Sequence, residues 1–135
     1  MIKAVIFDFF GVVEHEGKPN TALIAYIRHK LRPDYKVGII SNAAGDWVDK
    51  TLAEDEVALF DDITISYKVG VAKPNPEIYG ISLKRLGVEA HDAVFIDDIE
   101  AYCHAARKLG MHSIRYSDFA QMKRELEDLL SVSDN

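Results

Sequence analysis

Residues 3–9 read Lys-Ala-Val-Ile-Phe-Asp-Phe, an apolar run with one carboxylate near its end. Three more runs are continuously apolar and end in polar residues, at positions 36–41, 93–97 and 112–116. Short runs of this kind are typical of strands that are buried on both faces of a parallel sheet. Residues 62–66 form a weaker fifth candidate. The sequence therefore predicts four or five parallel strands.

Helical patterns fill the intervals between these runs. One helix is predicted from Asn75, as its N-cap, with Pro76 at the first helical position and Gly87 just past the end. Another spans residues 100–109 and closes on Gly110, which suits a left-handed C-terminal cap. The first helix of the chain has an apolar stripe made of Leu23, Ile24, Ile27 and Leu31.

A last helix is predicted to begin at Asp118, where Gln121 is placed to complete a capping box, and residues 131–135 are expected to fray. Strands that alternate with helices imply right-handed crossovers and a parallel sheet covered on both faces. We therefore predict a single doubly wound α/β domain over residues 1–135. The inward face of the last helix is predicted to consist of Phe119, Met122, Leu126, Leu129 and Leu130.

The composition bounds the class of protein. The chain has 135 residues, 48% hydrophobic and 28% charged, with a formal net charge of −6, which fits one ordinary globular domain. The single cysteine, Cys103, excludes an intramolecular disulfide and favours a reducing compartment. No apolar run approaches the roughly 20 residues that cross a bilayer, and residues 1–7 lack the regions of a signal peptide. We expect a cytoplasmic protein whose acidic balance disfavours membrane and nucleic-acid partners.

Polar residues with the chemistry of phosphoryl transfer follow the predicted strands. In open sheets of this class, ligands bind at the carboxyl ends of the strands, beside the point where the strand order reverses. Each residue alone is equally well explained as a cap or a turn former, but together they offer carboxylates, a hydroxyl, an amide and an ammonium on one rim. These residues are Asp8, Ser41, Asn42, Lys73, Asp97 and Asp98.

The residue types suggest specific roles. Asp8, Asp97 and Asp98 would repel one another in a cleft unless a divalent cation neutralised them, and oxygen ligands favour Mg²⁺. Asp8 can then act as a carboxylate nucleophile that forms an aspartyl-phosphate, which water hydrolyses. Lys73 would offset charge on the phosphoryl oxygens. Ser41 and the backbone N–H groups after it, near a predicted helix start, would bind the remaining oxygens.

Four segments together resemble the four ordered motifs of the haloacid dehalogenase-like (HAD) hydrolases: Phe-Asp-Phe-Phe-Gly-Val-Val at 7–13, Ile-Ser-Asn at 40–42, Val-Ala-Lys-Pro-Asn-Pro-Glu-Ile-Tyr at 71–79, and Val-Phe-Ile-Asp-Asp at 94–98. The resemblance extends from residue 5 to about residue 116. Within it, the stretch from Lys73 to Tyr116 is especially similar to the branch that contains the amino-terminal phosphatase domain of soluble epoxide hydrolases.

The resemblance implies a Rossmann-like three-layer core and Mg²⁺-dependent phosphatase activity through an aspartyl intermediate. It makes Asp8 the nucleophile and a metal ligand, the backbone carbonyl of Phe10 a second ligand and Asp98 a third. It makes Asp97 act mainly through a metal-bound water. Its substrate would be phosphorylated and either small or macromolecular, with the phosphoryl group bound by Ser41, Asn42 and Lys73.

The first motif departs from the phosphatase pattern. Phosphatases of the family usually have Asp-x-Asp, and the second Asp protonates the leaving oxygen, whereas this chain has Phe10. A phenyl ring cannot transfer a proton, and such assistance contributes roughly 10²–10⁴-fold. Activity should therefore be slow, confined to substrates with good leaving groups, or dependent on a substitute acid. Glu14 and His15 are the nearby candidates, although their segment also fits a solvated turn.

An aromatic residue at this position also resembles the haloacid dehalogenases, whose first motif is Asp-x-Tyr and which need no metal. The pair Asp97-Asp98 argues against them, and so does the lack of room for an inserted cap. Only 33 positions separate Asp8 from Ser41, and 32 separate Ser41 from Lys73.

A site without a cap is open to water, so a macromolecular substrate or a second subunit in a homodimer would have to cover it. The sequence leaves both possibilities open.

The sequence is also compatible with two functions: a phosphatase weakened by Phe10, or a catalytically impaired member of the family that binds a phosphorylated ligand or a partner protein. Trp47 and Tyr79 begin helices near the cleft, and core packing is the favoured role for both.

Overall fold

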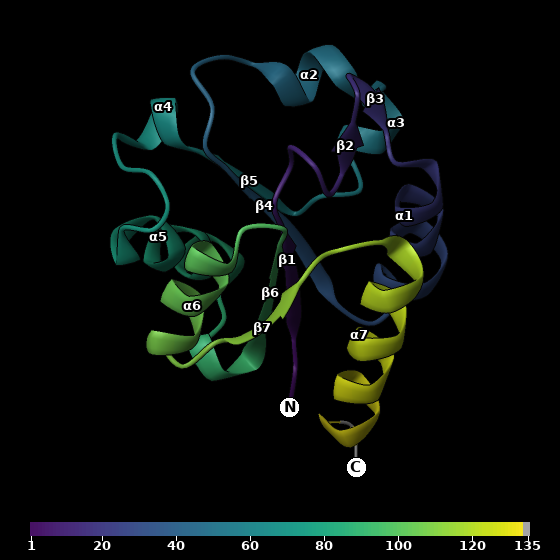
Figure 1. Cartoon of the computed structure of the whole chain (residues 1–135), viewed down its shortest axis with the longest axis vertical. Helices are drawn as coiled ribbons and strands as arrows, with labels where there is room; N and C mark the ends of the chain where they lie inside the picture. The colour runs from purple at the N-terminus through teal and green to yellow at the C-terminus, as the bar shows by residue number, and fades with distance from the viewer. Residues whose placement is uncertain (134–135) are drawn as a thin grey trace.

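A parallel five-stranded sheet lies at the centre of the computed structural model, which describes residues 1–133 (Figure 1). Its strand order is β5-β4-β1-β6-β7, so the chain extends from β1 to one edge and then returns to build the other. This is the predicted doubly wound topology. The five predicted strands are all present, as β1 (Ala4–Phe7), β4 (Lys36–Ser41), β5 (Asp62–Ile65), β6 (Ala93–Asp97) and β7 (His112–Arg115).

Strand β1 is shorter than the predicted run 3–9. The backbone N–H of Asp8 still donates to the Ile96 carbonyl at 2.8 Å. One residue further along the chain, the Phe9 carbonyl accepts hydrogen bonds from the N–H groups of Val12 and Glu14 at 3.2 and 2.9 Å. These two bonds close a turn. Asp8 therefore lies where the middle strand ends and the turn begins.

The sheet is covered on both faces, as predicted. Val5 and Phe7 of β1 pack in one apolar cluster, and Ala4 and Ile6 pack in the other. Helices α1 (Thr21–Tyr26) and α7 (Phe119–Ser133) cover the first cluster, together with the π-helical segment η1 (Ile27–Leu31). Helices α5 (Pro76–Leu86) and α6 (Glu100–Lys108) cover the second. Figure 1 shows the two pairs of helices on opposite sides of the sheet, which gives three layers.

The predicted helix ends are largely confirmed. Asn75 caps α5 by accepting the Glu77 N–H at 2.9 Å, and Gly87 ends the helix at φ +73°. Before α7, the Asp118 carboxylate accepts the Gln121 N–H at 2.8 Å, and the Gln121 side chain accepts the Asp118 N–H at 3.3 Å. These reciprocal bonds form the expected capping box.

The predicted helical stripe at Leu23, Ile24, Ile27 and Leu31 is buried. The last turns are π-helical, with the Arg32 N–H bonded to the Ile27 carbonyl at 2.9 Å, a feature that side-chain periodicity does not reveal.

Helix α7 is assigned through Ser133 and residues 134–135 lie outside the described part of the chain, so the expected fraying of residues 131–135 stays a prediction. One expectation needs correction. Trp47 is 48% exposed at the start of α2 (Trp47–Thr51) and is not a core residue, because that helix is short and only Val48 in it is buried. Tyr79, in contrast, is fully buried as predicted.

Short elements occupy the edge of the sheet where its strands end. They are the hairpin of β2 (Glu14–His15) and β3 (Lys18–Pro19), helices α2, α3 (Glu54–Val57) and α4 (Ser66–Val69), while the 3₁₀ turn η2 (Ala90–Asp92) leads into β6. In Figure 1 the hairpin, α2 and α4 lie at the end of the molecule opposite both termini. Within residues 1–133 none of these elements is longer than five residues. No helix in that range combines the length and apolarity needed to span a bilayer.

Candidate active site

The sheet order brings the predicted site residues together. Strands β4, β1 and β6 are neighbours, with Phe7 paired to Ile39 on one side and to Ile96 on the other. Their carboxyl ends therefore place Ser41, Asp8 and Asp97 side by side. The predicted convergence at one edge is present.

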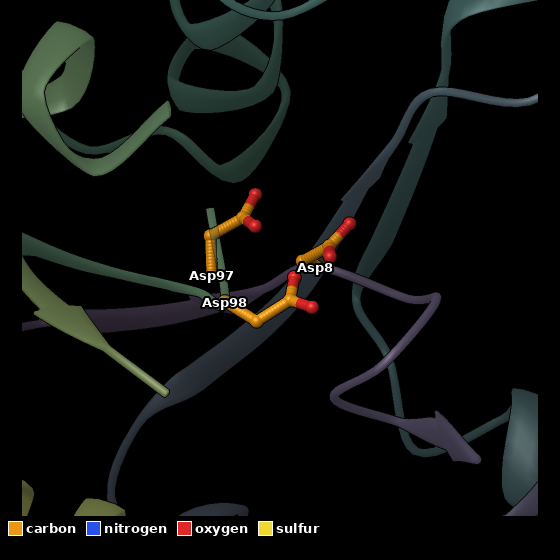
Figure 2. Close-up of side chains that lie close together, drawn as sticks. All are labelled: Asp8, Asp97 and Asp98. Atoms are coloured by element: carbon orange, nitrogen blue, oxygen red, sulfur yellow. The ribbon is translucent and has the colours of Figure 1, made fainter. Parts of the chain in front are cut away.

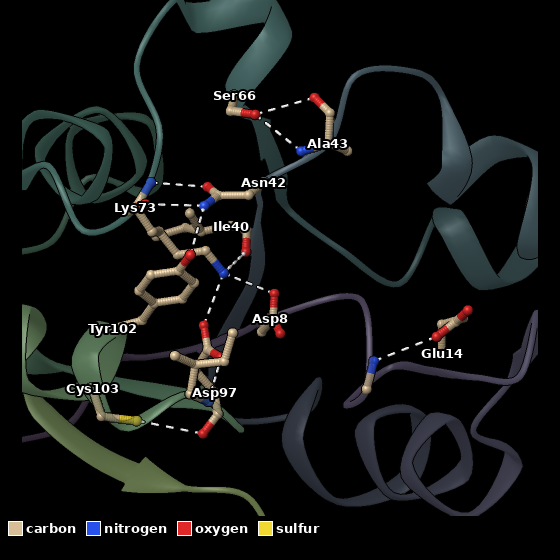
Figure 3. Close-up of polar contacts among 12 residues, drawn as sticks. Asp8, Glu14, Ile40, Asn42, Ala43, Ser66, Lys73, Asp97, Tyr102 and Cys103 are labelled. Carbon is tan, nitrogen blue, oxygen red and sulfur yellow. Dashed lines mark hydrogen bonds and ion pairs between the residues drawn. The ribbon is translucent and has the colours of Figure 1, made fainter.

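Lys73 is the central cation of this cluster. Its Nζ donates to Asp8 Oδ1 at 2.7 Å, to Asp97 Oδ2 at 2.8 Å and to the Ile40 carbonyl at 3.0 Å (Figure 3). The residue is only 3% exposed, and its ammonium also lies over the ring of Tyr102, 5.2 Å from the centroid. All three ammonium hydrogens are used, so the position of the charge is fixed.

Asn42 is hydrogen-bonded to the backbone of Lys73, and its predicted contact with a phosphoryl group stays a prediction. Its Oδ1 accepts the Lys73 backbone N–H at 2.8 Å, and its Nδ2 donates to the Lys73 carbonyl at 3.0 Å. The same Nδ2 lies 3.4 Å from the Tyr102 hydroxyl. The amide that the sequence assigned to phosphate binding is thus engaged by the backbone of Lys73, whose position it sets.

Three carboxylates converge beside Lys73. Asp8, Asp97 and Asp98 each present an oxygen, and these atoms lie within 4.8 Å of one another (Figure 2). Asp97 uses both of its oxygens, one toward Lys73 and the other to accept the Ile99 N–H at 3.0 Å. Asp98 Oδ1 is buried and has no hydrogen-bond partner.

These residues fit a divalent cation. Three carboxylates face one ammonium, which leaves an excess of negative charge in a largely buried place. The donors are all oxygen, the ligand type that Mg²⁺ and Ca²⁺ prefer. The unpartnered oxygen of Asp98 is the strongest single indication, because a buried carboxylate oxygen without a partner carries a desolvation penalty of about 1–3 kcal/mol or more.

Gly11 allows the turn after β1 to approach Asp98. It has φ +84°, and a Cβ placed on it would lie 2.6 Å from Asp98 Oδ2. Both the backbone conformation and the close approach favour glycine. The turn therefore packs directly on the carboxylate that has a free oxygen.

Burial changes the acidity of the cluster. It raises the pKa of the Asp8 carboxyl from 3.8 to about 7, with Lys73 opposing the change and Asp97 reinforcing it. Burial also raises the pKa of Asp97, again against the influence of Lys73. The protein alone thus disfavours two ionised carboxylates here, and additional positive charge would favour them.

Ser41 is the last residue of β4, the strand that neighbours β1, as the predicted strand end required. It is fully buried, and its hydroxyl has no hydrogen-bond partner. Within residues 1–133, three buried side-chain atoms are unpartnered: Ser41 Oγ, Asp98 Oδ1 and Ser82 Oγ. A buried polar atom without a partner calls for an explanation such as a bound ligand.

The loop after β4 does not match the predicted anion site at a helix start. The Ala43 N–H donates to Ser66 Oγ at 3.0 Å, and that hydroxyl donates back to the Ala43 carbonyl at 3.1 Å. Helix α2 begins only at Trp47 and has five residues. The first amide after Asn42 is therefore already bonded within the protein, and the N-terminus of α2 begins several residues beyond it.

Neither candidate for the missing acid is oriented toward Asp8. The Glu14 carboxylate accepts N–H groups from Gly11 at 3.4 Å and Gly17 at 3.1 Å, and Figure 3 shows it away from the Lys73 cluster. His15 is exposed, with its ring 6.1 Å from that of Tyr116. Glu14 stabilises the hairpin turn, and the solvated-turn interpretation fits the segment better.

Tyr102 and Ser66 are contacts that the sequence reasoning missed. Ser66 directly follows β5, so applying the rule of polar residues at strand ends to that weaker strand would have found it. Tyr102 lies one helical turn beyond Asp98 on α6, where nothing in the pattern separates it from an ordinary packing residue.

Comparison with known proteins agrees with this geometry. The model of a family described as haloacid dehalogenase-like hydrolase matches residues 14–116, most of the chain. The protein belongs to this family. Because that match begins after Asp8, the place of Asp8 rests on the structure and on the motif around it.

Relatives of the HAD protein include several phosphatases by name. It is 40% identical to bifunctional epoxide hydrolase 2 of Sus scrofa over 73 residues, 54% of this chain and 13% of that one. It is 30% identical to D-ribitol-5-phosphate phosphatase of Bacteroides thetaiotaomicron over 108 residues, 75% of this chain and 52% of that one. The chain thus spans about half, or much less, of the length of these relatives. The predicted similarity to the epoxide hydrolase branch is confirmed.

A solved structure extends the agreement to the fold. A HAD family enzyme of Bacteroides thetaiotaomicron, in complex with magnesium and inorganic phosphate, superimposes with a TM-score of 0.76 at 19% identity, over 90% of this chain and 99% of that one. At this identity the likeness concerns the fold.

Proposed function

We propose that this protein is a magnesium-dependent phosphomonoesterase with Asp8 as its nucleophile. The observation that carries the proposal is the bridge from Lys73 Nζ to Asp8 and Asp97, beside the unpartnered oxygen of Asp98. Nucleophile, ammonium and cation ligands then share one edge of the sheet. The phosphatases among the relatives support a phosphate ester as the substrate.

The residues divide the reaction between them. Lys73 binds one oxygen of Asp8 and lowers the pKa of that carboxyl against the effect of burial, which favours the ionised nucleophile. The other Asp8 oxygen attacks phosphorus, the ester bond breaks, and an aspartyl-phosphate forms. Water then releases phosphate and restores the carboxylate. The Ser41 hydroxyl, buried and unpartnered, is suited to bind a phosphoryl oxygen.

Asp8, Asp98 and the backbone carbonyl of Phe10 would hold Mg²⁺, with Asp97 contributing charge from beside them. Asp97 is the weakest direct ligand, because both of its oxygens are hydrogen-bonded within the protein. When bound, the cation supplies electrostatic stabilisation of the charge that develops on the phosphoryl oxygens.

A second candidate function rests on Phe10. Phe10 is 36% exposed, and its ring packs edge-on against that of Phe9, with centroids 5.1 Å apart. Glu14 is held by backbone N–H groups and cannot replace the missing acid without releasing them. A site without an acid at position 10 is also what we expect of a protein that binds phosphorylated ligands without hydrolysing them. The hydrogen bond from Lys73 to Asp8 favours the catalytic function, because ligand binding alone requires no nucleophile.

The test is hydrolysis of 4-nitrophenyl phosphate with and without Mg²⁺. We expect weak turnover that depends on the metal, is absent in Asp8→Asn and increases in Phe10→Asp. Asp92→Asn is a matched control, since Asp92 is as buried as Asp8 but lies in η2, before β6 begins. No turnover with any divalent metal, together with retained phosphate binding, would favour the second candidate.

A further inference from the structure

A shallow, open groove lies among the loops that follow β4 and β5. It has a volume of about 520 Å³ and is lined mainly by Ala43, Ala44, Tyr67, Gly70, Val71 and Ala72. Ala43 follows Asn42, Ala72 precedes Lys73, and the Asn42 amide is hydrogen-bonded to the Lys73 backbone. The lining of the groove is therefore joined to the cluster through the chain neighbours of Asn42 and Lys73.

The wall of the groove is mainly apolar, with Ser66 as its other polar residue beside the aromatic ring of Tyr67. Tyr67 is 44% exposed, and its hydroxyl donates to Asp46, which also pairs with Lys68 Nζ at 3.3 Å. This anchoring fixes the ring while leaving much of it accessible. Beyond Tyr67, the lining consists mostly of alanine, glycine and valine, whose small side chains leave room for a flat apolar group.

Within the described residues, neither candidate acid near Phe10 is placed to protonate the leaving group. Phe10 cannot transfer a proton, the Glu14 carboxylate is bonded to the N–H groups of Gly11 and Gly17, and His15 packs beside Tyr116. The leaving oxygen must then depart as an anion. A phenol has a pKa near 10, as tyrosine does, whereas an alkoxide resembles hydroxide, whose conjugate acid has a pKa of about 15.7. Departure without protonation therefore strongly favours aryl esters.

We infer that the substrates of this site are aryl phosphate monoesters, whose ring lies in the groove beside Tyr67. The inference rests on the proposed function and specifies its substrate class. Two independent features support it: a mainly apolar groove lined by the chain neighbours of Asn42 and Lys73, and, within residues 1–133, the engagement of Glu14 by backbone N–H groups, away from a leaving alkoxide.

The reaction balances without a further reactant. An Asp8 oxygen bonds to phosphorus, the bond from phosphorus to the aryl oxygen breaks, and the aryloxide leaves with the electron pair. Water then attacks phosphorus and the bond to Asp8 breaks. One proton of that water reaches the aryloxide through solvent, and the other stays on the phosphate, so the products are a phenol and inorganic phosphate.

The first experiment compares leaving groups with the native protein in Mg²⁺. The series contains 4-nitrophenyl, phenyl and 2-naphthyl phosphate, with glycerol 2-phosphate as the alkyl ester and acetyl phosphate as a good leaving group without a ring. Phosphotyrosine, free and within a peptide, distinguishes a small substrate from a protein side chain. We expect kcat/KM for phenyl phosphate to exceed that for glycerol 2-phosphate at least about 100-fold, and Phe10→Asp to narrow that gap about tenfold or more.

The second experiment tests the groove. Tyr67→Ala removes the ring and Ala44→Leu fills the space, so each should raise KM for 2-naphthyl phosphate about three- to tenfold while leaving acetyl phosphate unchanged. Tyr67→Phe keeps the ring and should retain the native KM. Leu109→Ala is the control, because Leu109 is an exposed apolar residue beyond the end of α6 and outside this groove.

The outcomes distinguish the inferred preference for aryl esters from the proposed phosphatase function. Equal hydrolysis of aryl and alkyl esters, or groove variants that leave naphthyl phosphate unaffected, would overturn the inference while the proposed phosphatase stands. A native protein that hydrolyses no ester in the series would overturn both.

Discussion

Lys73 donates three hydrogen bonds inside the site, two of them to carboxylates that would otherwise repel each other. A buried ammonium without such partners would be costly, and so would two unpaired carboxylates. The position of Lys73 is set in turn by Asn42, which binds both backbone polar groups of that lysine. At the scale of single residues, Asn42 therefore sets the position of Lys73, and Lys73 in turn stabilises the ionised carboxylate of Asp8.

Replacing Asn42 should disturb catalysis through Lys73. In Asn42→Ala, two hydrogen bonds to the Lys73 backbone are lost, and we expect a destabilisation of about 1–3 kcal/mol in urea unfolding and a lower kcat. A less well placed Lys73 stabilises the Asp8 carboxylate less, so the acidic limb of the pH profile for kcat/KM should move to higher pH. An unchanged limb would mean that Asn42 has a purely structural role.

The raised pKa of Asp8 predicts how stability changes with pH. Its folded-state pKa of about 7 exceeds the ordinary value of 3.8, so between these values the folded state binds more protons than the unfolded state. The free energy of unfolding of the metal-free protein should therefore decrease as pH rises from about 4 to 7. Urea titrations with EDTA measure this slope. Asp8→Asn should reduce it, and an equal slope in both proteins would contradict the assignment.

At the scale of elements, the turn after β1 is shaped by its contact with the end of β6. Gly11→Ala combines an unfavourable φ of +84° with a Cβ only 2.6 Å from Asp98 Oδ2. Gly17→Ala is the matched control, because Gly17 has φ +79° and nothing within 4 Å of its Cβ position. Both variants should lose about 1 kcal/mol or more from backbone strain.

Only Gly11→Ala should also weaken Mg²⁺ binding and turnover, since it alone displaces the Asp98 carboxylate. Calorimetric titration with Mg²⁺ compares the two variants directly. If both bind Mg²⁺ like the native protein, the contact between the turn and Asp98 has no part in the metal site.

The elements themselves could be predicted because their signals are local. Apolar runs, the Asn75 cap and the box of Asp118 and Gln121 each depend on a few neighbouring residues, and they have the expected structure. What the sequence could not supply is the direction of polar side chains. The Asn42 amide turns toward the Lys73 backbone, and Ser66 binds the Ala43 amide that was expected to face phosphate. The directions of these side chains depend on which loops lie next to each other at the edge of the sheet, and no single segment of the sequence specifies that arrangement.

At the scale of the whole molecule, the site joins segments from across the chain, with Asp8 and Lys73 65 positions apart. A ligand that binds several such segments only when the protein is folded stabilises the whole domain, because the unfolded chain cannot assemble the site. The excess of negative charge around Lys73 makes a divalent cation the ligand with the largest expected effect.

Mg²⁺ should therefore raise the unfolding temperature of the native protein. At about 100 times the dissociation constant, binding contributes about 2.7 kcal/mol, which for a domain of this size corresponds to a shift of several degrees. Asp98→Asn should largely abolish the shift, because it replaces the carboxylate whose oxygen lacks a partner. Asp92→Asn should shift like the native protein, since that buried carboxylate lies outside the cluster. Differential scanning calorimetry at constant ionic strength measures the effect, and the same shift in Asp98→Asn as in the native protein would place the cation elsewhere.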